Sequence, residues 1–118
     1  MEVSNHAFNR INERFKPVQS MREAERIAEQ AYKYGYTADY LRSDFKHLAS
    51  YLDFKKQGES ERTEIRLYKE CLWLWNGRRK VLRTVYPIYK LIPNATDLKK
   101  LRKREKENGC NEQNARAL

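Results

Sequence analysis

The sequence predicts an α+β fold in which helices come first and a three-stranded antiparallel sheet follows. Up to residue 56, apolar residues recur every three or four positions, the spacing of a helix's buried face. From Thr63 to Tyr68 they alternate with polar residues, as in a half-buried strand. Two runs rich in aromatic and apolar residues then flank the turn signal Asn76-Gly77. We therefore expect the N-terminal helices to pack on one face of the sheet, in a chain of 118 residues that suits one domain.

The first helix is expected over residues 5–16. Ser4 or Asn5 can cap it, because a short oxygen-bearing side chain accepts hydrogen bonds from the free N–H groups of the first turn. Pro17 stops it. Its apolar stripe consists of Ala7, Phe8, Ile11 and Phe15.

The next two helices are expected over residues 21–34 and 39–56. Ser20 and Glu23 have the spacing of a capping box. Gly35 suits the left-handed position that often follows a last helical turn. The third helix has Thr37 or Asp39 as its cap and four residues on its buried face, namely Leu41, Phe45, Leu48 and Leu52.

The strands are expected over residues 63–68, 72–75 and 81–89. Pro87 lies near the end of the third strand or at a sheet edge, because proline cannot donate a ladder hydrogen bond. In the second strand, alternation places Leu72 and Leu74 on one face and Trp73 and Trp75 on the other. We expect at least one tryptophan to be buried. The alternative is that the tryptophans, Tyr86 or Tyr89 are exposed and stack on nucleic-acid bases.

A basic helix follows the sheet. Asp97 can cap a helix over residues 98–107, whose apolar content is only Leu98 and Leu101. We therefore expect a single α+β domain over residues 1–93 and a loosely docked, basic helical tail over residues 94–118 that is partly disordered.

Composition indicates a polyanionic partner. The chain carries 25 Lys and Arg against 16 Asp and Glu, a formal net charge of +9. Such an excess on a short chain is typical of nucleic-acid binding, although it can also serve solubility alone. The two cysteines, Cys71 and Cys110, have no metal-binding spacing and are expected to be reduced thiols in the cytoplasm. We expect neither a cofactor nor a metal, and no membrane span.

The first helix carries a stripe of groups that suit phosphate chemistry. With His6 placed at 0° and an advance of about 100° per residue, Arg10 falls at about 40° and Arg14 at about 80°. Guanidiniums bind phosphate oxygens through paired hydrogen bonds, and an imidazole can move the proton of a ribose hydroxyl. The alternative is that both arginines are solvated or pair with Glu13 or Glu2, and that His6 has no task.

Two further basic clusters are candidate phosphate contacts. The first follows the Asn76-Gly77 turn and includes Arg78, Arg79, Lys80 and Arg83. The second lies in the last helix and includes Lys99, Lys100, Arg102, Lys103 and Arg104. Each is also compatible with a role in solubility alone, and a solvated basic helix binds polyanions in either case.

Parts of the chain resemble a known superfamily. The "HA-x-x-R-x-x-ER" pattern, the "TVYP" strand and the residues before it are similar to small bacterial and phage proteins grouped with the RelE-like (barnase–EndoU–colicin–RelE) ribonuclease toxins. The similar stretches are 4–15, 67–69, 72–75 and 82–87. The resemblance implies helices packed on an antiparallel sheet and RNA cleavage without metal. Carried over by position, it points to His6, Arg10, Arg14 and Thr84. The chain departs from the short members by a helical insertion over residues 36–57.

The functional hypothesis is therefore RNA binding by a toxin-like or phage accessory protein, with metal-free endoribonuclease activity as its catalytic form. In that form His6 is the general base or acid, Arg10 and Arg14 hold the phosphate, and Thr84 orients it. One alternative is a regulator that binds nucleic acid without cleaving it. Another is a phage inhibitor of a host defence protein. An acidic protein such as an antitoxin is a further candidate partner, and RNA is favoured over DNA.

Overall fold

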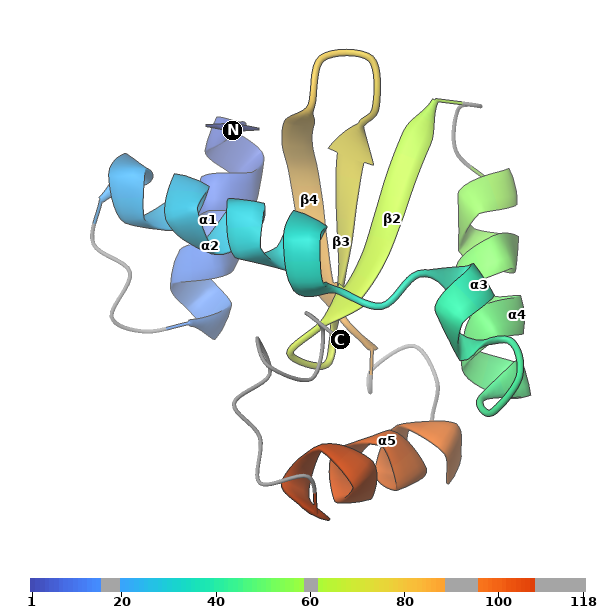
Figure 1. Cartoon of the computed structure of the whole chain (residues 1–118). Coiled ribbons are helices and arrows are strands. Elements are labelled where there is room, and N and C mark those ends of the chain that lie inside the picture. The colour runs from blue at the N-terminus through green and yellow to red at the C-terminus, as the bar shows by residue number, and fades with distance from the viewer. Residues whose placement is uncertain (16–19, 59–61, 89–95, 108–118) are drawn as a thin grey trace.

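The computed structural model describes residues 1–15, 20–58, 62–88 and 96–107. Figure 1 shows a central sheet with helices packed around it. In chain order the elements are β1 (Glu2–Val3), α1 (Asn5–Arg14), α2 (Met21–Tyr34), α3 (Ala38–Leu41), α4 (Lys46–Gln57), β2 (Thr63–Tyr68), β3 (Cys71–Asn76), β4 (Val81–Pro87) and α5 (Thr96–Glu107).

The α+β class is confirmed, but the sheet is four-stranded and mixed rather than three-stranded and antiparallel. Its order is β1-β4-β3-β2. The three predicted strands form an antiparallel meander, and β1 pairs in parallel with the start of β4, where Glu2 lies opposite Val81 and Val3 opposite Leu82. A two-residue strand is too short to show an alternating pattern, so the sequence gives no sign of β1.

Helices cover both faces of the sheet, which corrects the expectation that they cover one (Figure 1). On one face, α1 and α2 bury both tryptophans, which have 0% exposure, so the prediction of a buried tryptophan is confirmed. The Nε1–H group of Trp73 donates to the Tyr68 carbonyl at 2.9 Å, and its ring stacks on Phe15. On the other face, α3, α4 and α5 cover the apolar residues Ile65, Leu67, Leu72 and Leu74.

The single helix expected over residues 39–56 is two helices, α3 and α4, separated by residues 42–45. All four residues of its predicted stripe are nevertheless buried. Phe45 precedes α4 and supplies no side-chain cap. Instead, the Asp97 carboxylate accepts the N–H groups of His47 at 2.8 Å and Leu48 at 3.2 Å. The break is therefore stabilised by a residue from α5, about fifty positions along the chain, which a local pattern cannot reveal.

The basic helix α5 is part of the core that covers this second face. Leu98 and Leu101 have 2% and 4% exposure and lie in the cluster that contains Leu48 and Leu52. This corrects the expectation of a loosely docked helix. The expected boundary after residue 93 and the expected disorder beyond residue 107, including Cys110, lie outside the described residues.

The β2–β3 turn and the residue after α2 each place a constraint on the backbone. Lys69 and Glu70 connect β2 to β3 with φ of 50° and 62°, the two positive angles of a type I′ turn. Gly35 has φ of −68°, so it is not in the left-handed position expected for it. A side chain there would place Cβ 2.4 Å from the Ala31 carbonyl oxygen and 2.8 Å from Cβ of Arg66. Glycine is required at this position by close packing of the helix end against β2.

Candidate nucleic-acid interface

One end of the molecule brings together the start of the chain and the β3–β4 hairpin. We call it the hairpin end: the first turn of α1, the start of β4 and the turn formed by Gly77–Lys80. Ser4 joins these parts, since its N–H donates to the Leu82 carbonyl at 3.0 Å and its hydroxyl donates to the Arg83 carbonyl at 3.2 Å. The Ser4 oxygen also accepts the N–H of Ala7 at 3.1 Å and so caps α1. The start of α1 is thereby fixed against β4.

This arrangement places His6 beside Thr84. The Nε2 atom of His6 lies 3.2 Å from the Thr84 hydroxyl oxygen, although the residues are 78 positions apart. Thr84 is 8% exposed and His6 is exposed, so the hydroxyl holds one edge of an imidazole that remains open to solvent. A ring whose Nε2–H donates to Thr84 has Nδ1 available to accept a proton. Two of the four positions to which the resemblance points, His6 and Thr84, are therefore in contact.

The two arginines of the α1 stripe differ from His6 in their surroundings. Arg10 pairs with Glu13 at 3.1 Å, which is the alternative considered for it above. Arg14 is half-buried, and its Nε is buried without a partner among the described residues. Its charge affects the buried thiol of Cys71. Burial raises the pKa of that thiol to about 11, and the nearby Arg14 charge opposes the rise.

The turn of the β3–β4 hairpin presents Arg78 and Arg79 to solvent. The Asn76 side-chain oxygen accepts their backbone N–H groups at 3.0 and 3.4 Å, which fixes the turn. Lys80 differs, because its ammonium contacts a carboxylate oxygen of Glu64 at 2.7 Å and the Tyr32 hydroxyl at 2.6 Å. The hydrogen bond with Glu64 is the main cause that raises the pKa of Lys80. Lys80 is thus engaged within the protein.

Arg83 is exposed where the register of β4 is interrupted. Thr84 lies opposite Leu74 and Leu82 opposite Trp75, so Arg83 is the extra residue of a β-bulge. A bulge bends its strand and redirects the side chains beside it. Here it separates Leu82, which faces α1 and α2, from Thr84, which lies on the strand position opposite Leu74.

Helix α5, which carries the second basic cluster, lies at the opposite end of the sheet, which we call the α5 end (Figure 1). Arg102 pairs with Glu70 of the β2–β3 turn, and Arg104 pairs with Asp44 at 3.1 Å while lying over the Phe45 ring. Lys99, Lys100 and Lys103 are exposed. The two basic clusters predicted from the sequence are therefore not one surface.

Sequence reasoning missed a lysine beside Tyr86. Tyr86 lies two residues beyond Thr84 on β4, and the Lys55 ammonium of α4 sits 4.7 Å from the centre of its ring. Tyr51, one helical turn before Lys55, belongs to the same group: burial raises its pKa, and the nearby Tyr86 adds to this. The strand pattern identified Tyr86 as a stacking candidate. Nothing in the α4 pattern distinguishes Lys55 from a solvated helix residue.

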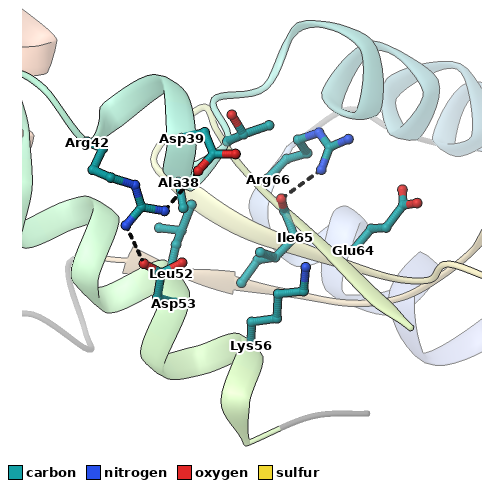
Figure 2. A pocket seen from close by; sticks show the side chains of 10 residues that line it. Ala38, Asp39, Arg42, Leu52, Asp53, Lys56, Glu64, Ile65 and Arg66 are labelled. Atoms are coloured by element: carbon teal, nitrogen blue, oxygen red, sulfur yellow. Dashed lines mark hydrogen bonds and ion pairs between the residues drawn. The ribbon is translucent and has the colours of Figure 1, made fainter. Parts of the chain in front are cut away.

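A cavity of about 230 Å³ lies between α3, α4 and the outer strand β2 (Figure 2). One of its cations, Arg42, is held by Asp39 at 2.9 Å and by Asp53 at 2.8 Å. The hydrogen bond with Asp53 is the largest cause that raises the pKa of Arg42. This part of the cavity is therefore internally neutralised.

Neither metal ligation nor a relationship to known proteins identifies the site. Within the described residues, no three His, Cys, Asp or Glu side chains group so that they could hold a metal ion. No helix in the same part of the chain has the length and apolar character to cross a bilayer. Comparisons with protein-family models, curated sequences and solved structures gave no match. Function must therefore be inferred from the site itself.

Proposed function

We propose that this chain binds RNA through the hairpin end. The observation that carries the proposal is a difference in pairing among the cations. Arg78 and Arg79 are exposed on the β3–β4 turn, and within the described residues no carboxylate pairs with Arg78 or with Arg79. Lys80, Arg102 and Arg104 each pair with a carboxylate. Exposed guanidiniums on a chain of net charge +9 suit the oxygens of a phosphate backbone.

Single-stranded RNA is the form that the site suits best. Beyond the hairpin end, near the other end of β4, the Tyr86 ring is partly exposed on the face that α4 covers and has the Lys55 ammonium over it. Rings of this kind stack on unpaired bases, while neighbouring cations follow the backbone. The resemblance of residues 4–15 to the ribonuclease toxins also favours RNA.

The contact between His6 and Thr84 supports a second, catalytic candidate. In metal-free cleavage, the imidazole takes the proton of a ribose 2′-hydroxyl, whose oxygen attacks the adjacent phosphorus and forms a 2′,3′-cyclic phosphate. The bond to the 5′-oxygen of the next nucleotide breaks, and that oxygen leaves as a hydroxyl with the proton that the imidazolium returns. Thr84 would fix the ring so that Nδ1 accepts the proton. Arg83 is next to Thr84 in sequence, and Arg10 is one helical turn after His6. These two guanidiniums are the candidates to bind the phosphate, Arg10 after it leaves Glu13.

Binding and cleavage are separated by one set of measurements. We expect the purified protein to bind labelled single-stranded RNA with an affinity that falls steeply as salt is raised. Duplex DNA of equal length should bind more weakly. Absence of salt-dependent RNA binding would contradict the proposal and favour a protein partner for the basic surface.

The cleavage test uses total RNA with and without a chelator, read on a gel. Cleavage that persists with the chelator, and that His6→Ala abolishes while RNA affinity stays near wild type, supports the catalytic form. Full cleavage by His6→Ala would exclude His6 as the catalytic group. RNA binding without cleavage by the wild-type protein leaves a binding protein.

A further inference from the structure

A second hollow lies beside the hairpin end, at the start of β2. Its volume is about 340 Å³. Three segments form it: the last turn of α4, the start of β2 and the β3–β4 turn. The residues that line it are Lys56, Arg62, Thr63, Glu64, Gly77 and Arg78. Of its three cations, only Arg78 belongs to a sequence-predicted cluster.

Gly77 explains why the cations meet. Its N–H donates to the Arg62 carbonyl at 2.7 Å, so the hairpin turn lies directly against the start of β2. A Cβ at this position would lie 2.2 Å from that same carbonyl oxygen, a distance that no side chain can occupy. The absence of a side chain at Gly77 thus brings Arg62 beside Arg78, sixteen residues further along the chain.

The hollow has an excess of uncompensated positive charge. Lys56, Arg62 and Arg78 are all exposed, and within the described residues no carboxylate pairs with any of them. The one acid in the lining is Glu64, and Lys80 binds it at 2.7 Å. Burial would raise the pKa of Glu64, but its hydrogen bonds with Lys80 and Tyr32 outweigh this and lower it. The Glu64 carboxylate therefore remains charged and neutralised from outside the hollow.

The cavity between α3, α4 and β2 adjoins this hollow but differs from it in how its charge is compensated. It shares Lys56 and Glu64 with the hollow, and Figure 2 shows the Lys56 side chain beside Ile65 and Glu64. There, Arg42 is bound by two carboxylates. Positive charge without a partner is thus concentrated on the side of β2 that faces the hairpin turn.

We propose that this hollow is a subsite for a backbone phosphate of the RNA strand that the hairpin end binds. The inference rests on the proposed function and extends it, because Arg78 belongs to both surfaces. A strand that contacts Arg79 and Arg83 continues over the turn, and its next phosphates meet Arg78, Arg62 and Lys56. Two guanidiniums and one ammonium around a small hollow suit the tetrahedral oxygens of a phosphodiester.

The test compares single neutralising variants by their affinity for fluorescein-labelled, mixed-sequence single-stranded RNA over a range of salt. We expect Lys56→Gln and Arg62→Gln each to weaken binding several-fold and to make the salt slope shallower by about 0.7, the value for one lost phosphate contact on a single strand. The matched control is Arg22→Gln, an exposed arginine on α2, which should bind as wild type does. Arg79→Gln reports on the hairpin end alone.

The outcomes separate the two proposals. If Lys56→Gln and Arg62→Gln match Arg22→Gln while Arg79→Gln weakens binding, the hollow is not a subsite and the proposed function stands. If wild-type protein does not bind RNA, both proposals fail. The side-chain NMR resonances of Arg62 and Arg78 distinguish a nucleic-acid phosphate from a free one. RNA should shift both resonances; shifts caused by inorganic phosphate but not by RNA would overturn the proposal.

Discussion

The hairpin end and the α5 end contain the same kinds of residue but use them differently. At the α5 end, Arg102 and Arg104 pair with Glu70 and Asp44, and two leucines on the same helix enter the core. At the hairpin end, Arg78 and Arg79 project from a turn and have no carboxylate partner among the described residues. The arginines of the two ends therefore differ in whether a carboxylate compensates them, and the proposed RNA binding rests on that difference.

The largest effect is expected at the α5 end, where the comparison assigns a structural role. Leu101→Ala should lower the free energy of unfolding by about 2–5 kcal/mol, because it removes a buried side chain and leaves a cavity. Lys100→Ala, one position away and exposed, should change it by no more than about 0.5 kcal/mol. Denaturant unfolding measures both. Equal stability of the two variants would show that α5 is docked by its charges instead.

At the hairpin end, the backbone rather than a buried side chain limits stability. Gly77→Ala should destabilise the protein by about 1–3 kcal/mol, because the new Cβ would lie 2.2 Å from the Arg62 carbonyl oxygen and must displace backbone. The matched control is Gly58→Ala, where Cβ would meet only the Lys55 oxygen at 3.6 Å and φ is −77°. That variant should be stabilised by about 0.4–1 kcal/mol. Thermal melts that rank the two variants in the opposite order would contradict this account of the turn.

A smaller effect tests whether α5 also organises α4. Asp97→Ala removes the acceptor of the His47 and Leu48 N–H groups and should cost about 0.5–2 kcal/mol, the range for loss of a helix cap. Asp97→Asn keeps an acceptor oxygen and should retain most of that stability. Hydrogen exchange at the two amides gives the local measurement. Unchanged protection in Asp97→Ala would show that α4 begins independently of α5.

Local chemistry explains how much of the fold could be predicted. Ser4 and Ser20 cap their helices as expected, each accepting an N–H three residues on, because capping depends on neighbours in sequence. The division into α3 and α4 could not be predicted, since the N–H groups at the start of α4 bond to Asp97. Strand β1 depends likewise on pairing with residues 81–82.

In the candidate site too, features set by neighbours in sequence could be predicted, and features set by distant residues could not. The helical period correctly placed His6 on an accessible side of α1, and the resemblance drew attention to Thr84, which His6 contacts. The period could not show that Arg10 binds Glu13 or that Lys80 binds Glu64, because side-chain pairing depends on rotamers and on distant strands. Lys56 and Arg62 had no sequence signal at all. Arg62 meets Arg78 through the close approach at Gly77, and Lys56 joins them from the last turn of α4.

The last prediction tests the comparison through charge alone. Arg79→Gln and Arg104→Gln remove the same group from the two ends, and both positions are exposed, so neither should change stability by more than about 1 kcal/mol. Their effects on RNA should differ. Arg79→Gln removes a guanidinium with no carboxylate partner and should weaken binding several-fold, with a salt slope shallower by about 0.7. Arg104→Gln removes a charge that Asp44 already compensates, so affinity and slope should stay near wild type. Fluorescence anisotropy at several salt concentrations measures both variants. Equal losses would show that RNA is attracted by net charge, and the distinction between the ends would then apply to folding alone.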